Sequence, residues 1–134
     1  MNKSDDIYDI INLWLHTVRY DDSKEISKLY AKNAVLLGTV AENVKQGRAV
    51  IKTYFDEFKK KNPVGVLNSI IFQDLGKNYG SADGNYTFEL DEKCGDEIIR
   101  IKVPARYTFV VNTKTKLIQT HHSSSTPENK PTAI

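Results

Sequence analysis

Residues 97–112 read EIIRIKVPARYTFVVN. In the first half of this run, isoleucine and valine alternate with Arg100 and Lys102, the period of two that is typical of a β-strand with one apolar face. Three further segments after Pro63 have the same character and are separated by turns rich in glycine and asparagine: residues 64–74, 79–90 and 117–125. Because the connections are short, the sequence predicts an antiparallel arrangement of neighbouring strands.

The residues before Pro63 carry a helical pattern instead. A first helix, capped by Ser4 or Asp5, has apolar residues at three- and four-residue spacing. A short second helix with Tyr30 on its apolar side, a strand over residues 34–39 and a third helix over residues 48–61 follow. Helices kept apart from a run of strands indicate the α+β class, with three helices on one face of the sheet.

The composition limits the partners and the domain count. The 134 residues suffice for one domain, assigned to residues 1–127, with a loose tail over residues 128–134. Nineteen basic and seventeen acidic residues give a net charge of +2, so a nucleic-acid partner is not expected. No segment resembles a membrane span or a secretory leader, and Cys94 is the single cysteine, so the sequence predicts a cytoplasmic location, no membrane partner, no metal and no cofactor.

The segment over residues 64–75 is apolar on both of its faces. Strict alternation would place Val66, Ile70 and Phe72 on one face, and would place a second apolar set on the other face: Leu67, Ile71 and Leu75. Helices can cover only one of these faces. The sequence therefore predicts a homodimer or higher homo-oligomer that forms through the outer face of the sheet.

Two stretches carry a family likeness: GRAVIKTYFDEF at residues 47–58, and ARYTFVV at residues 105–111 with HHSSSTP at residues 121–127. With the order of elements, they resemble the nuclear transport factor 2-like (cystatin-like cone) superfamily. Within it they are most similar to the association, or hub, domain of calcium/calmodulin-dependent protein kinase II and its small bacterial relatives, beside the SnoaL-like and ketosteroid-isomerase-like groups. The resemblance implies a curved antiparallel sheet wrapped round a long N-terminal helix, and an oligomerising fold without kinase chemistry.

Arg106 is the first candidate for a ligand pocket. Alternation from Arg100 and Lys102 would place it on the polar face. A bulge at Pro104, which cannot donate a ladder hydrogen bond, would turn Arg106 toward the interior, and the family's pocket arginine matches this position. Three alternatives follow: Arg106 binds a small acidic ligand, pairs with an internal carboxylate, or stays exposed.

The histidines at the end of the chain provide the second candidate. Neighbours on a strand point to opposite faces, so His121 and His122 cannot hold one metal ion together. The family alignment places His121 and Ser123 on one face, and we take His121 to be the pocket residue. Tyr54 and Trp14 line the pocket or belong to the core.

The sequence leaves two functions open. The first is a stand-alone hub-like oligomerisation module with a pocket for a small acidic or apolar ligand and no catalysis. The alternative is a small isomerase or cyclase, of the SnoaL or ketosteroid-isomerase type, that acts on an apolar carbonyl substrate. An enzyme of this type needs a carboxylate of raised pKa in an open cavity, and the general-base candidates are Asp21, Asp22 and Asp74.

Overall fold

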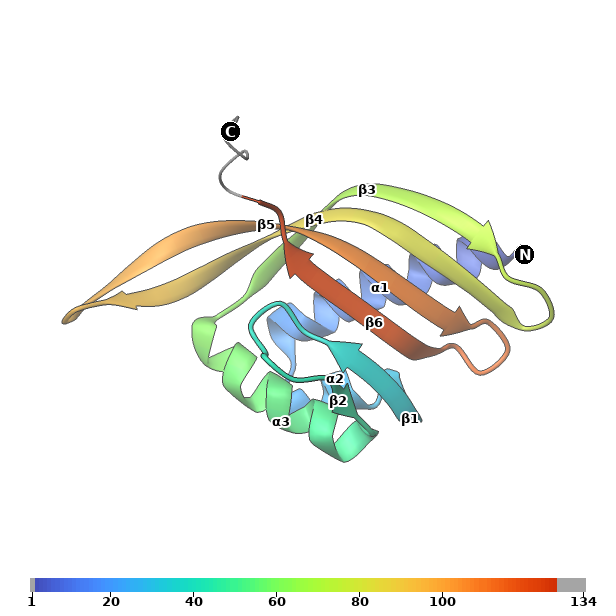
Figure 1. Ribbon diagram of the computed structural model, residues 1–134, viewed down its shortest axis with the longest axis horizontal. Coiled ribbons are helices and arrows are strands. Elements are labelled where there is room, and N and C mark those ends of the chain that lie inside the picture. The colour runs from blue at the N-terminus through green and yellow to red at the C-terminus, as the bar shows by residue number, and fades with distance from the viewer. Residues whose placement is uncertain (1, 128–134) are drawn as a thin grey trace, which may run out of the picture.

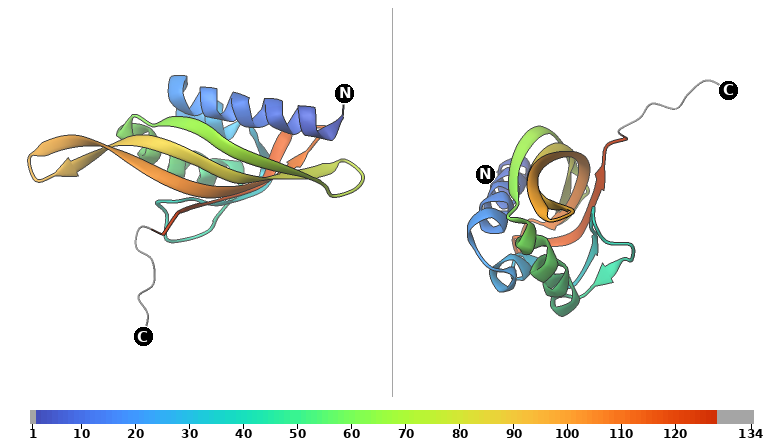
Figure 2. Two further views of the ribbon diagram at one scale, coloured as in Figure 1. Left: turned by 90° about the horizontal axis from the view of Figure 1, so that it is seen from above. Right: turned by 90° about the vertical axis from the view of Figure 1, so that its left-hand side faces the viewer.

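The computed structural model describes residues 2–127. Six strands form one curved sheet in the order β2-β1-β6-β5-β4-β3. The helices lie on the concave side of this sheet, with α1 running along β3 and β4 (Figures 1 and 2). The α+β class and the curved sheet with its long N-terminal helix are therefore confirmed. The expected loose tail, residues 128–134, lies outside the described residues.

The helices follow the predicted pattern closely. Asn2 caps the first helix, where Ser4 or Asp5 was predicted, because its side-chain oxygen accepts the Asp5 amide at 3.0 Å. Asp22 caps the second helix, because its side-chain oxygen accepts the Glu25 amide at 3.0 Å. The helical segments are α1 (Lys3–Tyr20), α2 (Ser23–Ser27), α3 (Arg48–Phe58) and the 3₁₀ turn η1 (Lys59–Lys61).

The strands are β1 (Tyr30–Leu37), β2 (Lys45–Gln46), β3 (Val64–Asp74), β4 (Tyr79–Cys94), β5 (Glu97–Asn112) and β6 (Leu117–Ser125). All neighbours pair antiparallel except β1 and β6, which are parallel. Tyr30 begins a strand, whereas the sequence predicted it within the second helix. The Leu29 carbonyl accepts the Ile118 amide of β6 at 2.9 Å, so pairing with β6 has replaced the helix there.

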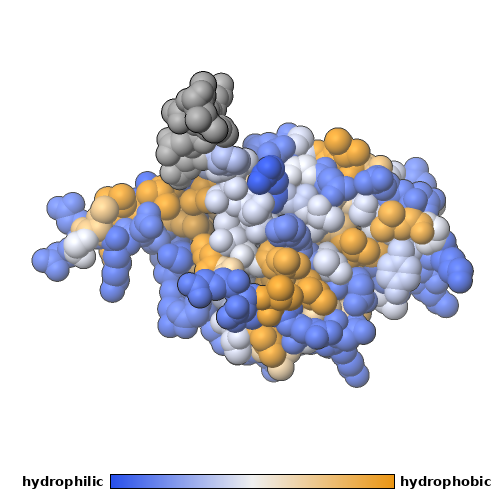
Figure 3. All heavy atoms as spheres, in the orientation of Figure 1, coloured by the Kyte–Doolittle hydropathy of each residue, from blue (hydrophilic) through white to orange (hydrophobic). Residues whose placement is uncertain are grey.

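The β4–β5 hairpin extends beyond the sheet as an arm (Figure 1). β4 continues four residues past its predicted end, to a turn in which Gly95 adopts a φ of 64°. An ion pair of 2.9 Å between Asp91 and Arg100 joins the two strands of the arm. Apolar side chains remain in contact with solvent along the arm (Figure 3). Ile98 near its tip is exposed.

A bulge in β3 corrects the predicted division of its apolar residues. The register against β4 shifts between Leu67 and Ser69, so that Asn68 is an extra residue and the faces exchange there. Leu67 therefore packs against the core together with Ile70 and Phe72, instead of opposite them. On the outer side, Val66 is 54% and Ile71 is 66% exposed.

The outer face is more polar than the sequence suggested. Across the sheet, Ile71 is followed in register by Asp83, Thr108 and His122. Asp83 accepts hydrogen bonds from Thr108 and from Gln73. Exposed aliphatic surface on this face is therefore concentrated on the edge strand β3.

Candidate functional site

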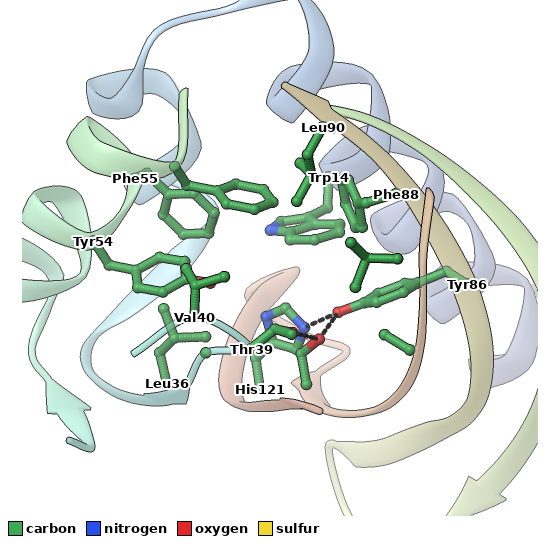
Figure 4. A pocket seen from close by; sticks show the side chains of 15 residues that line it. Trp14, Leu36, Thr39, Val40, Tyr54, Phe55, Tyr86, Phe88, Leu90 and His121 are labelled. Carbon is green, nitrogen blue, oxygen red and sulfur yellow. Dashed lines mark hydrogen bonds between the residues drawn. The ribbon is translucent and has the colours of Figure 1, made fainter. Parts of the chain in front are cut away.

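A small cavity lies between the helices and the concave face of the sheet (Figure 4). The centre of a water-sized sphere can move within about 30 Å³ of it, and the empty space around these positions, including the mouth toward solvent, is about 420 Å³. Within the described chain, no lining residue is an aspartate, glutamate, lysine or arginine. Most of the lining is aromatic or aliphatic, and it includes Trp14, Leu36, Val40, Tyr54, Phe55, Phe58, Phe88, Leu90 and Val103.

Trp14 occupies the centre of the aromatic lining. It is placed there by the apolar stripe of α1 and is 2% exposed. Its ring stacks on Tyr86 and meets the ring of His121 edge-on, with centroids 5.8 and 5.0 Å away. Aromatic pairs at such distances add to the stability that burial provides. The walls of the cavity are therefore held by packing between α1 and β4 and β6.

The polar side of the cavity is a chain of buried hydrogen bonds around His121. The Tyr30 hydroxyl lies 2.8 Å from Nδ1 of His121, and the Tyr86 hydroxyl lies 3.1 Å from its Nε2. Tyr86 in turn donates to Ser123 Oγ at 2.6 Å, and Ser123 lies 2.5 Å from the Thr39 hydroxyl. Figure 4 shows Tyr86 and His121 pointing toward one another.

Burial keeps the titratable groups of this hydrogen-bond chain, His121, Tyr30 and Tyr86, uncharged at neutral pH. It lowers the pKa of His121 to about 3 because the imidazolium would be desolvated, and the charge of His122 adds to this effect. Burial also raises the pKa of Tyr86 and of Tyr30 well above the ordinary phenol value. The site therefore offers neutral donors and acceptors, and no general acid or base that titrates near pH 7.

Four of the five predicted pocket residues line the cavity. His121 and Ser123 share a face of β6 and point inward, and His122 is exposed on the other face. Tyr54 and Trp14 contribute walls and are also part of the core. Burial raises the pKa of Tyr54 to about 12, against the effect of the Val40 and Thr39 amides.

The predicted inward turn of Arg106 is wrong. β4 and β5 pair without a register shift from Tyr79–Asn112 to Cys94–Glu97, and Arg106 is exposed on the outer face. The carbonyl of Pro104 accepts a hydrogen bond from the amide of Thr126, just beyond the end of β6. In an antiparallel strand the nitrogen and the carbonyl of one residue face the same neighbour, so the ring nitrogen of Pro104 faces that segment as well. Since β4 requires no N–H group from Pro104, the ladder continues without a bulge.

Sequence reasoning missed three members of the polar chain. Tyr86 belongs to an alternating strand, and its inward direction follows from that alternation. The sequence predicts a helix at Tyr30 and the end of a strand at Thr39, and neither position can be related to His121 without the pairing of the sheet.

A second hollow of about 290 Å³ lies outside the cavity. It is formed by the segment that follows β1 and by the end of β6, and it has a more polar lining that includes Glu42, Asn43 and Ser124. Gly38, Thr39 and Ser123 line both hollows. These three residues therefore form the boundary between the apolar interior and the polar exterior.

Residues 2–127 contain no group of three or more histidine, cysteine, aspartate or glutamate side chains that could hold a metal ion. None of the described helices is both long enough and apolar enough to span a bilayer.

The model of the calcium/calmodulin dependent protein kinase II association domain family matches residues 3–127. The chain belongs to this family. A Xanthomonas campestris protein of known crystal structure, described as such an association domain, is 33% identical to this chain. That structure superposes with a TM-score of 0.85, over 96% of this chain and 91% of the other.

More distant structures share the fold of this association-domain protein at lower identity. The epoxide hydrolase/cyclase-like enzyme SalBIII is 16% identical and superposes with a TM-score of 0.78, over 94% of this chain and 95% of its own. A Shewanella denitrificans protein described as a SnoaL-like polyketide cyclase is 15% identical. It superposes with a TM-score of 0.68, and 89% of each chain is covered. At these identities the likeness establishes the fold alone. No curated protein matches the chain.

Proposed function

We propose that this protein is a self-associating module whose cavity holds a small, neutral, largely apolar molecule without transforming it. The observation that carries this proposal is the lining of the cavity, which is aromatic and aliphatic and has no charged residue in the described chain. An acidic ligand, as expected from Arg106, would lose its hydration there without a cation to compensate. The ligand is therefore assigned as neutral.

The alternative, an isomerase or cyclase, receives less support from the geometry. Asp21 and Asp22 cap helix ends, and Asp74 forms an ion pair of 2.6 Å with Lys3. The hydrogen bond from Lys3 holds the pKa of Asp74 below its usual value, the opposite of what a general base near neutral pH requires. None of the three lines the cavity.

Self-association is supported by membership of the association-domain family and by the outer face of the sheet. Val66 and Ile71 are more than half exposed on the edge strand of that face. A second copy of the chain would cover them and would exclude water from the neighbouring Thr108 and His122. The interface proposed here is the outer sheet face, as expected from the sequence.

Sedimentation tests the interface. We expect the wild-type chain at tens of micromolar to sediment as a dimer or larger species, and the Ile71→Lys variant to shift toward the 15.2 kDa monomer. Leu13→Lys is the matched control, because Leu13 is exposed on α1, away from the sheet face. A monomeric wild type, or an equal effect of the two variants, would contradict the proposed interface.

Ligand binding is tested separately by titrating the ¹⁵N-labelled protein with cyclopentanone. The chain has one tryptophan, so its indole N–H resonance reports on the cavity without ambiguity. Ala105→Leu should abolish the shift because Ala105 lines the cavity, whereas Ala31→Leu, outside the lining, should leave it. A wild type that shows no saturable shift would contradict the ligand part of the proposal.

A further inference from the structure

The direction of the buried hydrogen-bond chain is determined at Trp14. The indole N–H lies 3.0 Å from the Tyr30 hydroxyl, and an indole can only donate. Tyr30 therefore accepts from Trp14 and has its own proton to place. Since Tyr30 is 0% exposed and its other partner is Nδ1 of His121, that proton goes to Nδ1.

The opposite arrangement would leave a buried proton unpaired. If Nδ1 of His121 carried the hydrogen, the Tyr30 oxygen would accept from both Trp14 and His121, and its own hydroxyl would lack an acceptor. A buried hydroxyl that lacks an acceptor is destabilising, because the hydrogen bond it made to water in the unfolded chain is not replaced. Neutral His121 is thus the tautomer with the hydrogen on Nε2.

From His121 the direction continues to the edge of the cavity. Nε2–H donates to Tyr86, and Tyr86 donates to Ser123. The distance between Ser123 and Thr39 permits either direction, and because Ser123 already accepts from Tyr86, its own proton is directed to Thr39. The six groups from Trp14 to Thr39 carry six protons but are joined by five hydrogen bonds. One proton remains, and because Trp14 cannot accept, it remains on the Thr39 hydroxyl.

We infer that Thr39 recognises a hydrogen-bond acceptor oxygen on the ligand, and that Trp14 and Tyr30 are positioning residues that make Thr39 a donor. Thr39 lies where the inner cavity meets the outer hollow. The ligand class is therefore a small neutral molecule with an apolar body in the cavity and a ketone, ester or amide oxygen at Thr39. This inference rests on the ligand part of the proposed function.

The tautomer provides a test that needs no ligand. Long-range ¹H–¹⁵N spectra distinguish the protonated from the unprotonated ring nitrogen of His121. We expect hydrogen on Nε2 alone in the wild type, and a mixture of tautomers in Tyr30→Phe, in which the connection to Trp14 is lost. A wild type with hydrogen on Nδ1, or an unchanged tautomer in Tyr30→Phe, would overturn the role given to Trp14 and Tyr30.

Ligand selectivity tests the contact at Thr39. Cyclopentanone and methylenecyclopentane have nearly the same shape and differ in whether they carry an acceptor oxygen. The dissociation constants of the two probes are measured in the wild type and in Thr39→Val. Comparing their ratio between the two proteins cancels the difference in hydration between the probes. We expect Thr39→Val to weaken the ketone about fivefold relative to the hydrocarbon, which corresponds to about 1 kcal/mol for one neutral hydrogen bond.

The outcomes separate this inference from the proposed function. Thr53→Val is the control and should leave the ratio as it is in the wild type, because Thr53 is exposed on α3 and lies outside the cavity lining. If both probes bind but Thr39→Val leaves the ratio unchanged, the contact at Thr39 is refuted and the cavity remains a ligand site. If neither probe binds, the ligand part of the proposed function fails together with the inference, whereas self-association, which sedimentation measures, is unaffected.

Discussion

His121 and His122 are neighbours on β6, yet the two faces of the sheet give them opposite surroundings. His121 is 2% exposed and hydrogen-bonds to two tyrosines, and burial lowers its pKa to about 3. His122 is exposed and stands in register with Thr108 on the outer face. The comparison shows that the inner face carries both the packing and the neutral polar chain, whereas the outer face is free to contact a partner.

The largest expected difference between the faces is in packing, and adjacent residues of β5 can measure it. Phe109 is fully buried and its ring stacks on His121 at a centroid distance of 3.9 Å. Phe109→Ala should lower the free energy of unfolding by about 3–5 kcal/mol, because it removes a buried aromatic ring and leaves a cavity. In urea denaturation the neighbouring Thr108→Ala should cost about 1 kcal/mol at most, and similar losses in the two variants would contradict the assignment of the faces.

The hydrogen-bond chain should contribute the next largest effect. Tyr86→Phe keeps the ring but leaves the Nε2–H of His121 without its acceptor and the oxygen of Ser123 without the donor from Tyr86. We expect a loss of about 1–3 kcal/mol in the free energy of unfolding, the cost of unpaired buried polar groups. Tyr79→Phe serves as the control, since Tyr79 is exposed. A neutral Tyr86→Phe would show that the chain of hydrogen bonds contributes nothing to folding.

Acid pH should distinguish the two histidines. The pKa of His121 is about 3 in the folded protein and about 6.5 when unfolded, so between these values the unfolded chain binds a proton that the folded chain does not. Stability is therefore complete above about pH 6.5 and decreases as the pH falls, by about 2 kcal/mol between pH 7 and pH 5. Denaturation curves at pH 7, 6 and 5 should show this slope in His122→Gln and lack it in His121→Gln.

The smallest effect concerns Arg106. Because its side chain is exposed on the outer face, Arg106→Ala should change the free energy of unfolding of the monomer by no more than about 0.5 kcal/mol. It should also leave the affinity for cyclopentanone unchanged. A measurable loss of that affinity in Arg106→Ala would mean that the guanidinium reaches the ligand and that the two faces are less separate than described.

The sequence alone determined most of the fold, because its strongest signals are local. The apolar stripe of α1 and the alternation along β3, β5 and β6 specify elements whose bounds agree closely with the structure. The family resemblance placed His121 and Ser123 on one face, and which face is the inner one became visible only in the structure. Period and capping depend on residues within a few positions of one another, and these relations are visible in the chain itself.

The tertiary structure decided where the strands bulge and which side chains meet. The bulge lies at Asn68 and not at Pro104. Pro104 needs no bulge, because the side of it that lacks an N–H group faces the end of β6. This contact joins Pro104 to Thr126, twenty-two residues away in the sequence. The chain from Trp14 through His121 to Thr39 joins α1, β1, β4 and β6. Such contacts depend on the packing of distant segments, and no local pattern encodes that packing.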